Sequence, residues 1–559
     1  MFSWLVLTYR NLCQTMPSWL RQQTGNPLKV PETRPCLASG MNRRHSPSRS
    51  TFLHSFRRHD GGGVAIIFAL ASIPLLMAAG MAIDYSVNSN ARQEVQNAVD
   101  AAALSLAKLP LDTSETELKA KGDAQVKLAL SKSGIGGLVV TTVRDGDYIR
   151  VGITGNTPTS LTQLLGHTQL ALNVTSTAKR STTNLELALV LDNTGSMKGP
   201  KLTNLKAAAT DLVDNLFKQT DPAKPNALKI GIVPFSMTVN LGPTAAGSDY
   251  LDLGANSSIH KMIFKPGESG ANRFTLFTAM KRTWAGCVES RPTPYDVDGT
   301  PPSSLYPDTL FVPFFAPDES DNDTLAVNSY MDDLPNGKRD NSLTNRERQG
   351  LTEKYSKNTF KVGASDRQGS TGYLYGPNAG CEIQPLTRLT TSKSTVLNAI
   401  TAMSVSGDTN VPIGLAWGWH LLSPFAPFRD GVAYDDLKTK KFIVLMTDGQ
   451  NQSTYNNSEN RSYYSGIGYI WQNRIGTISN DMATRSKAMD DRLSALCANV
   501  KNSNVQVFTI RVEVTEGTNE VLKACASKAS MFFDVKDSSG LPAVFKAIAE
   551  QISDLRIAN

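Results

Sequence analysis

The stretch LELALVLDNTGSM occupies Leu185–Met197 and joins an apolar run to a polar cluster. Its apolar, β-prone residues predict a strand that is buried on both faces, as in a parallel sheet. Asp192 ends this strand, and Thr194 and Ser196 follow at alternate positions before a helix expected at about 201–217. Open α/β sheets bind their ligands at the C-terminal ends of parallel strands. One carboxylate and two hydroxyls there are hard oxygen donors, which suit magnesium, manganese or calcium better than zinc.

Two segments far along the chain complete a candidate metal site. Thr409 lies in the loop GDTN, before a helix expected at 413–422, and Asp448 follows the apolar strand FIVLM at 442–446. A capped strand-to-helix turn would explain the first segment alone. Oxygen-bearing residues from three such loops favour a cation site instead. The candidate ligands are Asp192, Thr194, Ser196, Thr409 and Asp448, with Mg²⁺ as the preferred ion and Mn²⁺ or Ca²⁺ as alternatives.

This set of three loops resembles the metal ion-dependent adhesion site of the von Willebrand factor A domain, whose first loop is usually Asp-x-Ser-x-Ser. Thr194 replaces a serine there and keeps the hydroxyl. The resemblance implies a doubly wound, mostly parallel α/β sheet of the von Willebrand A or Rossmann-like class over residues 183–556, with an insertion at about 240–390. It also implies that the first-loop hydroxyls bind the metal directly and that a partner's carboxylate completes its coordination.

The segment 61–83 contains no charged residue and is long enough to span a bilayer as a helix. Five arginines precede it closely: Arg43, Arg44, Arg49, Arg57 and Arg58. The positive-inside rule therefore places the N-terminus in the cytoplasm and the remainder outside. A cleaved signal peptide fits less well, because the apolar run is long and no Ala-x-Ala site follows it. We expect residues 1–60 to be a basic, disordered tail, with Met41 as an alternative start.

The net charge of +7 is mild, and no nucleic-acid-binding motif accompanies the basic tail, so we expect no nucleic-acid partner. After the apolar segment, an amphipathic stalk helix is expected at 84–110. Its apolar stripe consists of Ala91, Val95, Val99, Ala102 and Leu106. The stripe either packs on its own domain or binds pseudopilin-like partners.

The block from Gly61 to Leu106 resembles the N-terminal segment of TadE/TadG-like proteins of the tight-adherence (Flp) pilus system. The matching residues are Gly80, Asp84 and Tyr85, then Gln96, Ala98, Asp100, Ala101 and Ala102. No glutamate stands at the position that prepilin-like relatives have after their cleavage site, so we expect no such processing. A small α+β region follows at 111–182, with a helix near 115–130 and strands near 138–143, 148–153 and 169–177.

The expected insertion is rich in Gly, Pro, Asn, Asp and Ser and is too long for a simple loop. Its phrases TWAGCVES, LFVPFFAPDE and YGPNAGCEI again resemble TadG-type proteins. Its acidic run is either a solvated loop or a calcium site, and comprises Asp318, Glu319, Asp321 and Asp323. Aromatic residues after Asp448 either contact a partner or pack on their own domain, and comprise Tyr463, Tyr464, Tyr469 and Trp471.

Six cysteines divide between the two sides of the membrane. Cys13 and Cys36 fall on the cytoplasmic side and should stay reduced, whereas four fall outside, where disulfides persist. Four cysteines allow three pairings. We favour Cys287–Cys381 and Cys497–Cys525, because each pair shares a local region. None of the cysteines has the CxxC spacing that is typical of zinc or redox sites, so we expect neither kind of site here.

The sequence contains no Walker A, HExxH or Gly-x-Ser-x-Gly motif, and Ser196 has no nearby base, so we expect no enzyme. The leading hypothesis is a single-pass inner-membrane component of a tight-adherence pilus assembly apparatus, with a periplasmic, metal-dependent domain that binds pilus-assembly or pseudopilin-like proteins. A surface adhesin that binds an external ligand through the same site is the alternative. A metal-dependent hydrolase would need a base that the sequence does not supply.

Overall fold

The computed structural model describes residues 63–557, apart from short segments at 110–112, 147, 180–182, 221–223, 225, 269–270, 335–340, 364–365, 369–371 and 515–519. The expected basic tail, Met41, Cys13 and Cys36 lie outside the described residues. Residues up to Ala78 and residues from Ala79 onward form two separate compact units.

One long helix, α2 (Gly63–Ala107), contains both the expected membrane span and the expected stalk. Its N-terminal part is long and apolar enough to cross a membrane. The side chains there are exposed, as lipid contact requires; Phe68 is 75% exposed and Leu76 71%. Pro74 lies inside the helix without ending it, which is common in membrane-spanning helices because neighbouring groups satisfy the freed carbonyl.

From Ala79 onward, α2 packs in a small module with α3 (Glu115–Ala129) and three strands: β1 (Gly136–Asp145), β2 (Tyr148–Pro158) and β3 (Gln169–Lys179). The strands form an antiparallel sheet in the order β1-β2-β3. The apolar stripe of α2 is buried in this module's core, with Val95, Val99 and Leu106 fully covered. The stripe therefore packs on its own domain, and the alternative of a partner-binding stripe is not what the structure shows.

Asp84 fastens α2 to the turn between β2 and β3. Its carboxylate accepts hydrogen bonds from the backbone N–H groups of Ser160, Leu161 and Thr162 at 2.6–2.9 Å, and from the Thr162 hydroxyl at 2.6 Å. The Thr162 hydroxyl, followed by these N–H groups, holds the pKa of Asp84 well below its usual range. One turn earlier, Gly80 leaves room for Leu161, since a Cβ there would lie 2.7 Å from the Leu161 Cβ. These contacts give Gly80 and Asp84 of the TadE/TadG-like motif a structural role.

We expect Asp84→Asn to loosen this turn, because an amide cannot accept all four hydrogen bonds and has no charge to strengthen them. Amide hydrogen exchange at Ser160–Thr162 should accelerate by about tenfold or more. The wild-type contribution should be present at neutral pH and lost in acid, because a carboxyl whose folded pKa is lowered stabilises the fold only while it is ionised. Asp100→Asn, which removes a carboxylate bonded to Gln96 on the same helix, is the matched control. Equal exchange in both variants would contradict this role of Asp84.

The sheet domain, residues 183–557, contains an eight-stranded sheet. Five strands are parallel, in the order β11 (Phe532–Val535), β10 (Val505–Val512), β9 (Thr439–Thr447), β4 (Asn184–Asp192) and β5 (Leu228–Phe235). The insertion adds three short antiparallel strands beyond or beside β5: β6 (Val239–Asn240), β7 (Cys287–Val288) and β8 (Thr387–Thr390). The sheet is therefore mostly parallel, with an antiparallel edge that the sequence analysis did not foresee.

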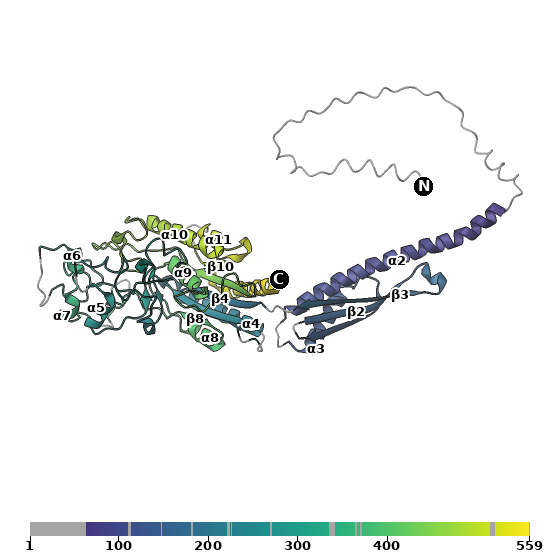
Figure 1. The fold of residues 1–559 in the computed structure, drawn as a ribbon, viewed down its shortest axis with the longest axis horizontal. Helices are drawn as coiled ribbons and strands as arrows, with labels where there is room; N and C mark the ends of the chain where they lie inside the picture. Colours follow the sequence, from purple (N-terminus) through teal and green to yellow (C-terminus); the bar gives the residue numbers. More distant parts are fainter. Residues whose placement is uncertain are drawn as a thin grey trace, which may run out of the picture. The chain divides into compact units, whose positions relative to one another are not determined.

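Helices cover both faces of this sheet (Figure 1). One layer comprises α4 (Pro200–Lys218), α8 (Lys393–Ala402) and α12 (Leu541–Ile557); the other comprises α9 (Val411–Leu422), α10 (Met482–Asn502) and α11 (Glu520–Cys525). Strand β4 contributes to both cores, because Leu189 and Leu191 face one layer while Ala188 and Val190 face the other. The predicted strand buried on both faces is confirmed.

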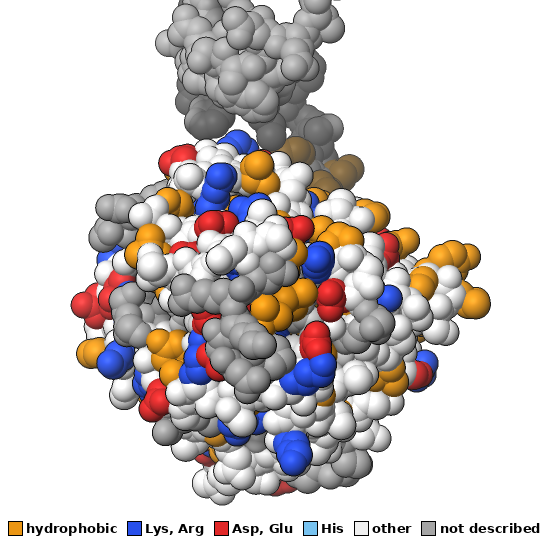
Figure 2. Space-filling model, turned by 90° about the vertical axis from the view of Figure 1, so that its left-hand side faces the viewer, with side chains coloured by type: hydrophobic (Ala, Val, Ile, Leu, Met, Phe, Trp, Pro, Cys, Tyr) orange, Lys and Arg blue, Asp and Glu red, His pale blue; other side chains and the backbone are white. Residues whose placement is uncertain are grey.

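The insertion folds onto the domain with little regular structure beyond α5 (Arg273–Ala279), α6 (Asn345–Gln349) and α7 (Lys354–Lys357). Disulfides join Cys287 to Cys381 and Cys497 to Cys525, the pairing favoured from the sequence. Figure 2 shows the end of the molecule where α5, α6 and α7 lie, and there positive and negative side chains are interspersed rather than gathered by sign.

Buried ion pairs replace secondary structure inside the insertion. Lys354 is fully buried, with its ammonium nitrogen 2.8 Å from the Asp318 carboxylate and 3.6 Å from that of Asp333. Arg273 and Glu289 form a second buried pair, and Arg474 joins it at 2.6 Å. Because a buried charge without a partner is very costly, these pairs fix where each loop can lie.

The acidic run is held by protein groups. Asp318 pairs with Lys354, Asp321 pairs with Lys361, and Glu319 accepts from the Tyr469 hydroxyl at 2.8 Å. Asp323 accepts from the backbone N–H of Leu325 at 3.0 Å. Asp318 and Glu319 are buried, so the expectation of a solvated loop is wrong for them, and these contacts favour a structural role over the calcium site considered above.

The aromatic residues after Asp448 likewise pack on their own domain. Tyr469 is buried against Glu319, and Tyr464 is buried and donates to Glu289. The Trp471 indole donates to Asn460 at 3.0 Å, and Tyr463 is half-buried. Tyr464 and Tyr469 are therefore unavailable as contacts for a partner.

We expect Lys354→Met to destabilise the sheet domain by about 3–5 kcal/mol, because it leaves two buried carboxylates without their cation. Thermal or urea denaturation measures this loss. The control is Lys357→Met, one turn away, which removes an exposed pair with Glu353 and should cost less than about 1 kcal/mol. Similar losses in the two variants would show that the buried pairs do not hold the insertion.

Candidate functional site

The predicted ligands lie at the C-terminal edge of the sheet. Strands β4 and β9 run parallel in a register that pairs Leu191 with Met446. Asp192 and Asp448, which follow these partners by one and two residues, therefore end neighbouring strands. A one-turn 3₁₀ helix, Gly195–Met197, follows Asp192 and presents Ser196 at the surface. The loop that contains Thr409 is fastened to the loop that follows β4, because the Gly195 N–H donates to the Gly407 carbonyl at 3.0 Å.

Four of the five predicted residues form one continuous hydrogen-bonded chain. The Thr194 N–H donates to Asp192 Oδ1 at 2.8 Å. The Thr194 and Ser196 hydroxyl oxygens are 2.9 Å apart, and the Ser196 hydroxyl donates to Asp448 Oδ1 at 2.7 Å. Asp192 and Thr194 are buried while Ser196 is exposed. Carboxylates separated by 256 positions in the chain are thus joined through two hydroxyls.

Thr409, the fifth residue, lines the same surface hollow as Ser196 and Asp448. This hollow has a volume of about 440 Å³ and is also lined by Gln450, Gln452 and Glu513. The backbone of Thr409 is fixed by a hydrogen bond, because its carbonyl accepts from the Gln452 N–H at 2.8 Å. The hollow gives a ligand access to the oxygen atoms at this edge.

The site concentrates negative charge away from water. Burial, and after it the negative charge of Asp448, raise the pKa of Asp192 to about 6, against the opposing effect of hydrogen bonds from Thr194 and Thr447. Ionised Asp192 is therefore destabilised by its surroundings, and a positive charge at this edge relieves that cost.

Sequence reasoning missed two residues that contact the predicted ligands. The Thr447 hydroxyl donates to Asp192 Oδ2 at 2.6 Å, and the Lys201 ammonium donates to Asp448 Oδ2 at 2.8 Å. Lys201 also lies 3.7 Å from Glu513. A signal for Lys201 was present, because it stands in the first turn of α4, where the helix dipole disfavours a cation unless an acidic partner is near.

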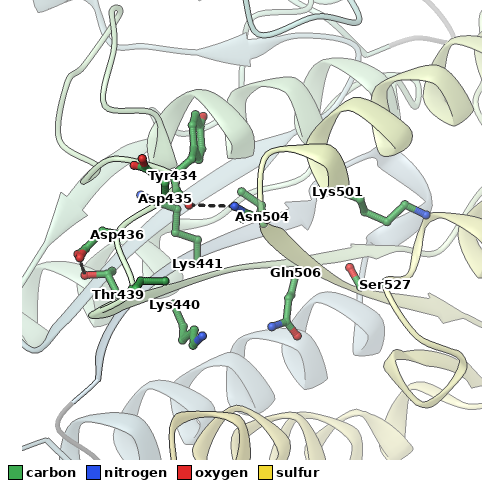
Figure 3. A pocket seen from close by; sticks show the side chains of 12 residues that line it. Tyr434, Asp435, Asp436, Thr439, Lys440, Lys441, Lys501, Asn504, Gln506 and Ser527 are labelled. Carbon is green, nitrogen blue, oxygen red and sulfur yellow. Dashed lines mark hydrogen bonds between the residues drawn. The ribbon is translucent and has the colours of Figure 1, made fainter. Parts of the chain in front are cut away.

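A second hollow, of about 510 Å³, lies at the opposite ends of β9 and β10, near Thr439 and Val505. Figure 3 shows two hydrogen bonds among its lining residues: Asp436 accepts from the Thr439 hydroxyl at 2.7 Å, and Asn504 donates to the Tyr434 carbonyl at 3.4 Å. It contains none of the predicted ligands.

We expect Lys201→Met to destabilise the cation-free protein by about 1–3 kcal/mol, because Asp448 loses a charged hydrogen-bond partner while Asp192 still faces it. Urea denaturation with a chelator present measures this change. The control is Lys206→Met on the same helix, which loses only a bond to the Thr401 carbonyl and should shift stability by about 0.5 kcal/mol or less. Unchanged stability of Lys201→Met would show that the lysine does not balance the carboxylates.

Comparison with known proteins gives one family match. Residues 62–107 match the family described as putative Flp pilus-assembly TadE/G-like, which is the segment where the resemblance was seen. The match covers α2 alone. No curated protein sequence matches the chain.

Several solved structures resemble the chain weakly. The pilus adhesin SpaC of Lactobacillus rhamnosus GG aligns at 11% identity and TM-score 0.30, over 74% of this chain and 34% of that one. The pilus adhesin RrgA of Streptococcus pneumoniae aligns at 10% identity and TM-score 0.31, over 74% and 50%. Proximal thread matrix protein 1 of the mussel byssus, whose structure has a zinc-occupied MIDAS motif, aligns at 11% identity and TM-score 0.26. The alignment covers 67% of this chain and 47% of that one. The chain thus spans a third to a half of these proteins.

Proposed function

We propose that this chain is a membrane-anchored protein-binding component of a tight-adherence (Flp) pilus assembly apparatus. Its sheet domain would be a von Willebrand factor A domain that binds a divalent cation and, through it, a carboxylate of a partner protein. The observation that supports this most directly is the hydrogen-bonded chain Asp192–Thr194–Ser196–Asp448 at the C-terminal edge of β4 and β9. That chain opens into a hollow that Thr409 also lines.

The donor set fits a hard divalent cation. Two carboxylates and three hydroxyls supply only oxygen atoms, the preferred ligands of Mg²⁺, Mn²⁺ and Ca²⁺. Among the described residues no cluster of three or more His, Cys, Asp or Glu side chains occurs, so a cation here depends on the hydroxyls of Thr194, Ser196 and Thr409 as well. The raised pKa of Asp192 supports the fit, since a cation would offset the repulsion between the buried carboxylates.

When bound, the cation would supply an electrophilic site for a partner's Asp or Glu carboxylate. The chain's own residues orient the ligands: Thr447 and the Thr194 N–H hold the Asp192 carboxylate by both oxygens. Lys201 holds Asp448. We propose binding rather than catalysis, because the Ser196 hydroxyl is bonded to Thr194 and to the Asp448 carboxylate, a weak base that Lys201 also holds, and not to a histidine or lysine that could activate it.

The place of the protein in the cell follows from its N-terminal segment. A helix that can cross a membrane coincides with the TadE/G-like match, which supports a single-pass membrane anchor and a role in pilus assembly. We propose that the N-terminus is cytoplasmic and the sheet domain periplasmic. The two disulfides fit that compartment, which is oxidising.

Calorimetric titration of the full chain in detergent with Mg²⁺ or Mn²⁺ tests the metal site. We expect binding at one site, weakened about 10- to 100-fold by Asp192→Asn, as for other supporting carboxylates of metal sites. This substitution keeps the shape of the side chain and removes the buried charge, so the fold should survive. Asp211→Asn, on the exposed side of α4, is the control and should bind as the parent does. A parent that binds no cation at millimolar concentration would overturn the proposed site.

Protease added to intact cells distinguishes the two locations. Protection of the sheet domain until the outer membrane is permeabilised is the expected result for a periplasmic protein. Cleavage in intact cells would instead support a surface adhesin that binds an external ligand through the same site.

A further inference from the structure

The turn between β2 and β3, residues 159–168, lies beside the end of the apolar segment of α2 (Figure 1). Asp84 holds three of the turn's backbone N–H groups, and Leu161 packs on Gly80. Gly80 and its neighbours up to Ile83 are the last residues of that apolar segment. With α2 leaving the membrane at the end of this apolar segment, the turn is held at the same level.

Apolar side chains of the turn point outward rather than into the module. Leu164 is 74% exposed, and Leu161 and Leu165 are 42% and 43% exposed. Exposed leucines this close together cost free energy in water. Met81 and Ile83 of α2 are also exposed, at 45% and 55%, so apolar surface is present on both the turn and the adjoining helix.

The hairpin contributes no charged side chain of its own at this end, where its turn binds the Asp84 carboxylate of α2. The sequence from Val151 to Ala178 contains no Asp, Glu, Lys or Arg. The flanking charged residues, Arg150 and Lys179, pair with Thr177 and Tyr148 at the far end of the two strands. The two ends of the hairpin therefore differ: Arg150 and Lys179 lie at the end far from Asp84, and the apolar turn lies at the end beside Asp84.

The backbone of the turn is satisfied internally. Asp84 accepts from the N–H groups of residues 160–162. Those of Thr159, Leu164 and Gly166 donate to carbonyls of the turn at 3.0–3.2 Å, and Gln163 caps the Ser160 carbonyl through its side chain. A backbone whose polar groups are bonded internally can approach the hydrocarbon region at lower cost, because water there does not satisfy N–H and C=O groups; this turn largely meets that condition.

We propose that the β2–β3 turn is a second membrane contact, which inserts Leu164 and Leu165 into the lipid interface where α2 emerges. The occupant of the apolar surface is lipid, because the turn is fixed to the last residues of the membrane segment and lacks charge. Together with α2, the turn would hold the small module at two points and so limit its tilt on the membrane. This proposal is independent of the metal site.

Spin-label accessibility tests the contact in the full chain reconstituted in phosphatidylethanolamine–phosphatidylglycerol vesicles. A label is attached to Leu164→Cys in a Cys13→Ser, Cys36→Ser background, with the two disulfides intact. The control label is at Thr177→Cys, an exposed position at the far end of the same hairpin. Both sites are exposed, so neither label should disturb folding, which circular dichroism checks.

We expect the label at position 164 to be several-fold more accessible to oxygen than to a water-soluble nickel chelate, relative to the label at 177. Equal exposure of both labels to the nickel chelate would overturn the proposal, because the turn would then lie in water. A label at 164 that is shielded from both reagents and immobilised would also overturn it, since that result indicates a protein contact, such as a second copy of the chain.

Discussion

The parallel pairing of β4 with β9 is the constraint on which the sheet domain and its candidate site depend. The two strands are separated by the insertion and several helices, yet their register places Asp192 and Asp448 at the same edge. The burial of β4 on both faces specifies this register, because its side chains pack against a helical layer on each side. A shift of one residue would turn the alternating leucines of β4 toward the wrong layer. Burial of the strand thus indirectly positions the oxygen atoms at its end.

The insertion shows a different way of ordering a long chain segment. Its apolar residues join the core on one face of the sheet, but few of its backbone groups lie in helices or strands. Buried charges such as Lys354 and Arg273 fix its loops by pairing with carboxylates and by donating to carbonyls. Such pairs add little net stability compared with apolar packing, but mispairing them is costly. We infer that these buried ion pairs contribute more to the specificity of the loop arrangement than to the free energy of unfolding.

Local sequence pattern was sufficient to predict many of the helices and strands. It did not reveal contacts between residues far apart in the chain. The strand that became β4, the uncharged helix before Asp84, and the helix and strand expected at 413–422 and 442–446 were predicted from local pattern and match the structure. The strands β6, β7 and β8 have two to four residues each, too few for any period to show. The partners of Tyr464 and Tyr469 lie 175 and 150 positions away, so no local signal could reveal that these rings are internal. For the site, strand ends identified Asp192 and Asp448, whereas the contacts of Lys201 and Thr447 join residues 247 and 255 positions apart.

Lys201 places a positive charge of the protein itself next to the candidate oxygen ligands. Its ammonium group balances Asp448 in the cation-free protein and lies at the rim of the carboxylate pair. A divalent cation that enters the site must share Asp448 with this lysine or displace it, and like charges repel at that range. The free ammonium would then face Glu513, already 3.7 Å away. If the proposed metal site is correct, Lys201 acts there as an internal cation that keeps this edge folded without metal and lowers the affinity for metal. The proposed site would then remain ordered when empty.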